Sequence, residues 1–266
     1  MTYARMGQRS LDFSLCQYGL SKNIFRGPKK QLNKPFIACF GSTDTFGQTV
    51  AAPFPLLLER HLKQPVANFG ILNGGLDAIL KDPELLALCN NASHIVIQIM
   101  GAHSQSNDYY SVHPRRNDRF ITAHSKLRDL YPNIDFTEFH FTRHMLSHLE
   151  TEDPDRFRRV RNHLRQTWQT NMRRLCHALP VKPHILWLSA RDMAPRENGL
   201  LEADPNFITS GDIDAILPFT RGLISVTKKR SLRKLPSFAV LEEMDQRAHD
   251  HCANMVCGEL HAKRPA

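Results

Sequence analysis

The sequence predicts an α/β protein in which helices cover both faces of a parallel sheet, giving three layers. Two short apolar runs, 36–40 and 93–100, are bounded by residues typical of turns. Because both runs are nearly continuous rather than alternating, they are typical of strands buried on both faces. A third run, 66–69, lies between them, and short helical segments separate the three. Strands that alternate with helices in this way favour a parallel sheet with right-handed crossovers.

The other elements follow from the same reasoning along the chain. Residues 1–34 are polar and irregular, and we expect them to form an N-terminal arm that wraps the sheet. A helix expected at 76–89 is interrupted at Asp82-Pro83, a helix start signal. The remaining expected elements are strands at 184–189 and 223–227 and helices at about 53–63, 211–218 and 240–260.

Residues 109–180 depart from the alternation of strands and helices. We expect helices at 120–131, 138–149 and 154–179. In the last, five large apolar residues recur at spacings of three and four, which indicates one buried face: Val160, Leu164, Trp168, Met172 and Leu175. The chain is therefore expected to be an arm followed by a single α/β domain, 35–266, with a helical insertion at about 109–180 laid over the sheet.

The composition limits the partners and the compartment. The net charge of +9 is spread along the chain without a nucleic-acid-binding motif, so we expect attraction to an anionic small molecule and no specific nucleic-acid binding. No apolar window is long enough for a transmembrane segment, and the N-terminus lacks a secretory signal. Six scattered cysteines favour reduced thiols and a cytoplasmic location. A homo-oligomer is left open.

Three early stretches resemble the start of an SGNH/GDSL-type hydrolase: 41–50, 53–62 and 66–70. The resemblance covers roughly the first 110 residues. It implies a flavodoxin-like, SGNH-like sheet and ester hydrolysis or acyl transfer. Over the whole chain, with 113–120 and 137–144, the sequence resembles more closely an uncharacterised bacterial family known only as a domain of unknown function, which implies no activity.

The loop after the first strand is the expected floor of the site, because ligands of open α/β sheets collect beyond the carboxyl ends of the strands. The SGNH resemblance places Thr43 at the position of the family's nucleophilic serine and Ser42 at that of its aspartate. Thr43 is therefore the candidate nucleophile and Ser42 the alternative, while Asp44 is a candidate substrate contact. The structural alternative is that these side chains satisfy backbone donors at a turn and cap the next helix.

The resemblance also implies donors for the oxyanion of an acyl-transfer reaction. The turn after the second strand supplies the Asn73 amide or the Gly74 N–H, although Asn-Gly is also a common choice for a tight turn. After the third strand, either His103 or Asn107 takes the place of the family's asparagine. The sequence does not choose between them.

For the base, the nearest match to the family's Asp-x-x-His is the pair Asp245 and His249. Residues four apart share a helix face, so Asp245 could orient His249. The alternative is a solvent-facing polar stripe. His249, His251 and Cys252 have no spacing typical of metal ligands, so no metal and no cofactor are expected.

The densest basic cluster follows the third strand: His113, Arg115, Arg116 and Arg119, with Arg143 further on. Guanidinium groups recognise phosphate, sulfate and carboxylate, so these residues are candidates for binding an anionic substrate. They could equally tie the insertion to the sheet through salt bridges.

These residues are therefore compatible with three functions. The first is an SGNH-like esterase or acyltransferase acting on an anionic small molecule, sugar or lipid-linked substrate. The second is a catalytically inactive domain of this fold that binds an anionic ligand or a protein partner. The third, a group transferase using the histidine and arginine clusters, lacks a phosphate-binding Gly-rich loop. The site proposals require the first and third strands to end side by side.

Overall fold

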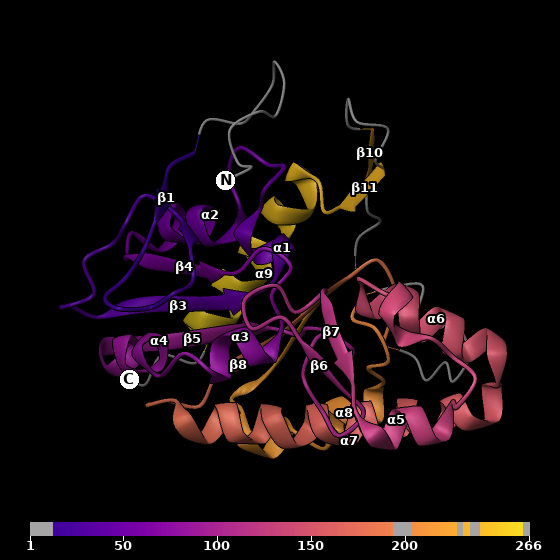
Figure 1. Cartoon of the computed structure of the whole chain (residues 1–266). Coiled ribbons are helices and arrows are strands. Elements are labelled where there is room, and N and C mark those ends of the chain that lie inside the picture. Colours follow the sequence, from indigo (N-terminus) through magenta and orange to yellow (C-terminus); the bar gives the residue numbers. More distant parts are fainter. Residues whose placement is uncertain (1–12, 194–203, 228–230, 235–239, 263–266) are drawn as a thin grey trace.

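The computed structural model describes residues 13–193, 204–227, 231–234 and 240–262 (Figure 1). Its centre is a five-stranded sheet in the order β4–β3–β5–β8–β9, with every neighbouring pair parallel. The strands are β3 (Phe36–Gly41), β4 (Val66–Gly70), β5 (Ala92–Gln98), β8 (His184–Ser189) and β9 (Gly222–Thr227). This confirms the expected parallel α/β class, and it confirms that the first and third strands of the sheet are neighbours.

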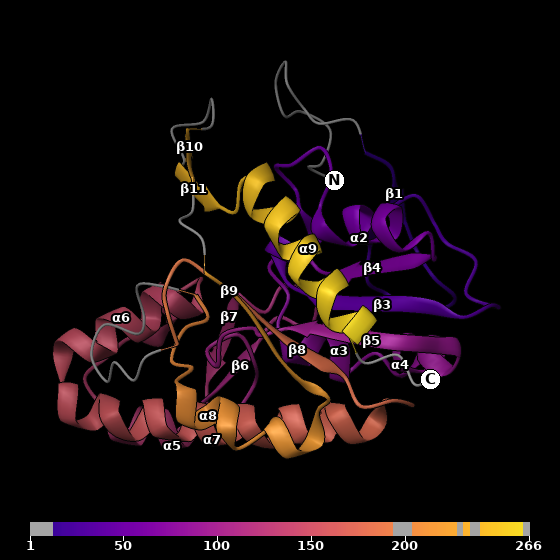
Figure 2. The ribbon, with the colours of Figure 1, turned by 180° about the vertical axis from the view of Figure 1, so that it is seen from behind.

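Alternate residues of the strands pack into two separate cores. On β3, Ile37 and Cys39 face α2 (Phe54–Leu62) and α9 (Gln246–Ala262), while Phe36, Ala38 and Phe40 face the opposite core. The second core is covered by α3 (Leu76–Leu80), α4 (Pro83–Ala87) and α7 (Pro154–Ala178). Figure 2 shows α9 on the other side of the sheet from α7. Helices on both faces explain why the strands read as unbroken apolar runs.

Helix α7 is the longest element and has the expected buried face. Phe157, Val160, Leu164, Trp168, Met172 and Leu175 are all buried in the core between the helix and the sheet. The Trp168 indole N–H donates to the carbonyl oxygen of Met100 at 2.8 Å. This bond satisfies the only polar group of a side chain that is otherwise apolar, and it fixes α7 against the end of β5.

The described part of the N-terminal arm packs against the sheet. Strands β1 (Leu15–Cys16) and β2 (Phe25–Arg26) form an antiparallel hairpin. The rings of Tyr18 and Phe25 lie 5.4 and 5.3 Å from that of Phe69 on β4. The Arg26 guanidinium donates to three carbonyl oxygens that follow the first helix of the domain, those of Gly47, Val50 and Ala51. The hairpin thus braces the loop that carries the candidate site.

The insertion contains a hairpin as well as helices. Strands β6 (Tyr110–Val112) and β7 (Phe120–Ala123) pair antiparallel, followed by α5 (Ser125–Leu130) and α6 (Thr142–Glu152). The helix expected at 120–131 is therefore wrong in its first residues, because β7 pairs with β6. The helix expected at 138–149 begins only at Thr142, because Phe141 has extended backbone and pairs with Arg119.

The insertion lies beyond the carboxyl end of β3, where the candidate site is expected. Figures 1 and 2 both place the β6–β7 hairpin and α6 beyond the end at which α1 (Thr43–Phe46) lies, where β3 stops. The roof of the expected site is thus formed by the β6–β7 hairpin together with α6, rather than by helices alone.

The C-terminal helix is shorter than expected. Residues 240–260 were expected to be one helix, but Val240–Glu243 forms β11, which pairs antiparallel with β10 (Ser231–Lys234), and α9 begins at Gln246. The helix expected at 211–218 is α8 (Ser210–Asp214) followed by a 3₁₀ turn, and that expected at 76–89 divides into α3, α4 and a 3₁₀ turn. Among the described helices, none combines the length and the apolar character needed to cross a bilayer.

Candidate active site

The turn that carries Ser42, Thr43 and Asp44 rests directly on the ends of two strands. A Cβ atom on Gly41, the last residue of β3, would lie 2.0 Å from the Thr45 hydroxyl. A Cβ atom on Gly70, the last residue of β4, would lie 2.3 Å from the Phe46 nitrogen. Both positions therefore require glycine: side chains approach closely at Gly41, and the backbone of α1 does so at Gly70. They allow α1 to begin immediately at the carboxyl edge of the sheet.

The structure brings Thr43 and Asn73 together. The Thr43 hydroxyl oxygen accepts a hydrogen bond from the Asn73 backbone N–H at 3.0 Å and lies 3.4 Å from the Asn73 side-chain oxygen. Thr43 is half-buried and Asn73 is exposed, with a positive φ of 54°. Gly74 lies in the same turn, but its N–H donates to the carbonyl oxygen of Ile71 at 2.9 Å. Of the two expected donors in this turn, the Gly74 N–H is used within the turn itself, and the Asn73 side chain presents its oxygen to the Thr43 hydroxyl as an acceptor.

The amide groups of the turn are held by Gln98, a residue that the sequence analysis missed. The Gln98 side-chain oxygen accepts from Ser42 N, Thr45 N and the Thr45 hydroxyl, at 3.2, 3.2 and 2.6 Å. Its amide nitrogen donates to a carboxylate oxygen of Asp44 at 3.3 Å. Ser42 itself makes no side-chain capping bond to α1. Asp44 is buried and contacts Gln98, so the structure places it under the turn rather than at its surface.

His103 lies in the loop after β5 and is almost fully buried. Its Nε2 atom is 3.0 Å from the Ser104 hydroxyl, while its Nδ1 atom is buried and has no hydrogen-bond partner among the described residues. Burial lowers the pKa of His103 to about 4; the Asp204 carboxylate opposes this shift and the Arg143 guanidinium adds to it. The loop packs against the turn after β4, because a Cβ on Gly75 would lie 2.1 Å from the Ser104 carbonyl oxygen. His103 is thus neutral at pH 7 and has one uncommitted nitrogen.

Asn107, the alternative to His103, is committed to its own loop. Its side-chain oxygen accepts from the backbone N–H groups of Tyr109 and Tyr110, at 2.8 and 3.3 Å, and its amide donates to the Gln105 carbonyl oxygen at 3.0 Å. These bonds use both ends of the carboxamide to form the turn into β6. Between the two candidates, the structure leaves His103 with the available atom.

His249 and Asp245 lie on the other side of the sheet, between α9 and α2. The Nδ1 atom of His249 accepts from the Phe54 backbone N–H at 3.1 Å, and the imidazole stacks on the Phe54 ring. Asp245 precedes α9, and its carboxylate accepts from the Ala248 N–H at 2.9 Å. Burial lowers the pKa of His249 to about 4, with the Arg26 charge adding to the shift and Asp245 opposing it. Within the described part of the chain, no hydrogen bond joins this pair to Thr43.

The basic residues of the β6–β7 hairpin loop make mostly internal contacts. The His113 Nδ1 atom accepts from the Arg115 and Arg116 N–H groups at 3.3 and 3.2 Å. Arg116 pairs with Asp118 at 3.5 Å, and Arg119 lies over the Phe141 ring at 5.8 Å. Arg115 is exposed. The Arg143 side chain, also exposed, is the basic residue whose charge reaches His103.

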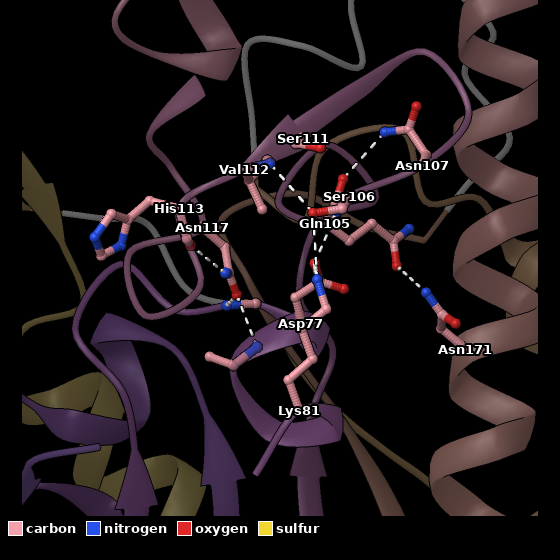
Figure 3. Close-up of polar contacts among 12 residues, drawn as sticks. Asp77, Lys81, Gln105, Ser106, Asn107, Ser111, Val112, His113, Asn117 and Asn171 are labelled. Carbon is pink, nitrogen blue, oxygen red and sulfur yellow. Dashed lines mark hydrogen bonds and ion pairs between the residues drawn. The ribbon is translucent and has the colours of Figure 1, made fainter. Parts of the chain in front are cut away.

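A polar network fixes this hairpin loop to the start of α3 (Figure 3). The Asn117 side-chain oxygen accepts from Gly75 N and Ala78 N at 2.7 and 3.1 Å, and its amide donates to the His113 carbonyl oxygen. The buried Asp77 carboxylate accepts from the Ser106 N–H at 2.9 Å and pairs with Lys81 at 2.6 Å. The insertion is therefore tied to the same turn that carries Asn73. No group of three or more metal-ligating side chains occurs among the described residues.

The whole chain matches one family model. Residues 1–264 match the family described as "Domain of unknown function (DUF6473)". The chain belongs to this family. No curated protein matches this DUF6473 chain.

Two solved structures are similar to this DUF6473 chain. One is a carbohydrate esterase family 2 enzyme plus carbohydrate-binding domain from Corynascus thermopiles (Myceliophthora fergusii), with 9% identity and a TM-score of 0.47, over 90% of this chain and 70% of the other. The second is described as a lipolytic protein of the G-D-S-L family from Desulfitobacterium hafniense DCB-2, with 9% identity and a TM-score of 0.43, over 85% of this chain and 99% of the other.

Proposed function

We propose that this protein hydrolyses or transfers an acyl ester, with Thr43 as the nucleophile. The observation that carries the proposal is the position of the Thr43 hydroxyl. It lies half-buried at the carboxyl end of β3 and is fixed by the Asn73 N–H at 3.0 Å. Ligands of such folds bind at this edge of the parallel sheet, which is where the Thr43 hydroxyl is held. The neighbouring Ser42 is the alternative hydroxyl.

The reaction needs a proton acceptor as well as a nucleophile. As the Thr43 oxygen bonds to the ester carbonyl carbon, its proton passes to an imidazole, and the same proton then goes to the alcohol oxygen when the ester C–O bond breaks. Water, or an acceptor hydroxyl in a transferase, then attacks the acyl-Thr43 ester and returns its proton to Thr43 through the imidazole. The donor that we propose for the oxyanion is the nitrogen of the Asn73 carboxamide, whose oxygen lies 3.4 Å from the Thr43 hydroxyl.

Two imidazoles are candidates for the base. His249, with Asp245, corresponds to the hydrolase pattern in sequence, but its Nδ1 atom is occupied by the Phe54 N–H. His103 follows β5, the neighbour of β3, and its Nδ1 atom has no partner in the part of the chain that the structure describes. A base needs a free lone pair near the proton that it accepts. This observation favours His103, with His249 as the second candidate.

The substrate class follows from the charges near this edge. Arg143 is exposed, and its charge reaches His103 from the insertion. An anionic group on a small molecule, a sugar or a lipid-linked substrate would be attracted there. Arg115, Arg116, Arg119 and His113 are further candidates at the hairpin loop. The cytoplasm is the compartment that we propose.

The test is hydrolysis of short p-nitrophenyl esters. We expect Thr43→Ala to lower kcat by about 10³-fold or more, because loss of a nucleophile removes the covalent route. Thr43→Ser should retain activity, since it keeps the hydroxyl and removes only the methyl group that restricts χ1. Ser42→Ala is the matched control and should stay within a few-fold of wild type. The proposal is wrong if the wild-type protein does not exceed the buffer rate or if Thr43→Ala equals wild type.

A further inference from the structure

One buried glutamine replaces the capping residue of the turn that carries Thr43. Gln98 is the last residue of β5 and is 4% exposed. Its side-chain oxygen accepts from the N–H groups of Ser42 and Thr45 and from the Thr45 hydroxyl. Ser42 stands at the N-cap position of α1 and makes no capping bond. The acceptor that a helix normally finds in its own N-cap side chain therefore comes from the neighbouring strand.

This arrangement leaves the Ser42 hydroxyl out of the capping of α1. A capping serine would use its hydroxyl oxygen to accept from the N–H two or three residues later. Here the N–H of that third residue, Thr45, bonds to Gln98, so the Ser42 hydroxyl is not used for capping. The contacts of Gln98 also lie on both sides of Thr43, to Ser42 before it and to Asp44 and Thr45 after it.

The side chain has little freedom to move. A Cβ atom on Gly41 would lie 2.5 Å from the Gln98 oxygen, so the glutamine packs directly against the end of β3. Its amide nitrogen donates to Asp44, which is also buried. The donors and acceptors match at both ends of the carboxamide. Replacing the amide nitrogen of Gln98 by an oxygen, as in Gln98→Glu, would therefore place two carboxylates in contact, that of the new glutamate and that of Asp44.

We infer that Gln98 is a positioning residue: it sets the position of the Thr43 hydroxyl by bonding the turn on both sides of that residue to the central strand of the sheet. This inference rests on the proposed function for its catalytic meaning, but the geometry that it describes can be measured without any activity. Because β5 also leads into the loop of His103, one side chain links the nucleophile turn to the strand that carries the favoured base.

The decisive variant is Gln98→Glu, which keeps the shape and the accepting oxygen. The introduced carboxylate would face that of Asp44, and two adjacent carboxylates do not both ionise readily. Among the described residues, the titratable groups at this position are Asp44 from the turn, the Cys252 thiol of α9 beside Asp44, and the Cys39 thiol of β3 beside Cys252. At low pH a shared proton restores the donor to Asp44, and at high pH the charges repel and displace the turn. We expect kcat of the variant to fall by about tenfold or more between pH 5 and 8, with KM little changed, while wild type shows no such fall.

The same change is followed without substrate by ¹H–¹⁵N NMR. The amide signals of Ser42 and Thr45 should titrate between pH 5 and 8 in Gln98→Glu and stay constant in wild type. The double variant Gln98→Glu with Asp44→Asn reverses donor and acceptor, so it should return these signals to their wild-type positions. Gln105→Glu is the matched control: Gln105 is fully buried and bonds to Ala102, Leu164 and Asn171 instead. It should lower stability without moving the Ser42 and Thr45 signals with pH.

The outcomes separate this inference from the proposed function. Titrating amides, restored by the double variant, support the positioning role even if wild type hydrolyses no ester, in which case only the esterase proposal fails. Unchanged amide signals in Gln98→Glu overturn the inference, and so does a pH profile of kcat identical to that of wild type in an active enzyme. A double variant that does not restore the signals also overturns it, because the Gln98–Asp44 contact would then not hold the turn.

Discussion

Two buried histidines, His103 and His249, show how the two sides of the sheet differ. Both are removed from solvent, and burial is the largest cause of the lowered pKa of each, about 4 in both cases. Each also lies near one carboxylate and one guanidinium, whose effects oppose each other. A perturbed pKa therefore does not distinguish the two residues, although such shifts are often used to find functional sites.

The hydrogen-bond partners distinguish them. His249 has its Nδ1 atom bonded to the first turn of α2 and its ring stacked on Phe54, so it joins two helices. His103 lies at the carboxyl edge of the sheet and has a buried Nδ1 atom that bonds to no described residue. A buried polar atom without a partner costs about 1–3 kcal/mol, so its retention calls for an explanation other than stability. The comparison teaches that hydrogen-bond partners, rather than burial, distinguish the two histidines, and this difference is the basis on which we propose His103 as the base.

The largest expected difference between the two histidines is in their contribution to catalysis. We expect His103→Asn to lower kcat for an ester substrate by about 10²–10⁴-fold, the usual contribution of a general base. His249→Asn should stay within a few-fold of wild type, because the asparagine oxygen can accept from the Phe54 N–H in place of Nδ1. The measurement is kcat at pH 7.5 with folding checked by circular dichroism. The opposite ranking would assign the base to His249 and Asp245.

A smaller effect on stability should be common to both histidines. Each has a folded pKa below the unfolded value of 6.5, so the unfolded chain binds more protons between pH 6.5 and about 4. Stability should therefore be intact above pH 6.5 and fall as the pH is lowered, by about 2 kcal/mol for each histidine at pH 5. Urea unfolding at pH 7.5 and 5 measures this loss.

Single variants divide the acid sensitivity between the two histidines. His249→Asn and His103→Asn should each remove about half of the pH-dependent loss, and His140→Asn, at an exposed position, should remove none. A chain whose stability is equal at pH 7.5 and 5 would contradict the description of both histidines as buried and neutral.

The smallest effect concerns the anion expected beside His103. Sulfate or phosphate at about ten times its Kd should stabilise the protein by about 1.4 kcal/mol, which corresponds to a few degrees in Tm. Arg143→Ala should abolish this increase, whereas Arg115→Ala, at the exposed hairpin loop, should retain it. Thermal unfolding with and without the anion, at constant ionic strength set with chloride, makes the comparison. Equal shifts in wild type and Arg143→Ala would exclude Arg143 as the anion contact.

Much of the fold could be predicted, because a buried face of a helix or strand places apolar residues at regular spacings in the sequence. The apolar runs that form β3, β4, β5 and β8 and the buried stripe of α7 were all identified. The β6–β7 and β10–β11 hairpins were not, because short antiparallel strands depend on a partner rather than on their own apolar content. Of the candidate site, the turn at Thr43 was found, while Gln98 was missed. The signal that could have identified Gln98 is its position as a polar residue at the end of an otherwise apolar strand, since buried polar residues generally have hydrogen-bond partners.

The sequence by itself determined the parallel sheet and the polar loops at the ends of its first three strands, because apolar periodicity and turn residues are local properties. Only the tertiary structure decided which side chains meet. It joined Thr43 to Asn73, bonded the turn that carries Thr43 to Gln98, and placed His249 against Phe54, which is distant in the sequence. The physical reason is that a hydrogen bond between loops requires atoms within about 3 Å, and packing of the whole core sets that distance.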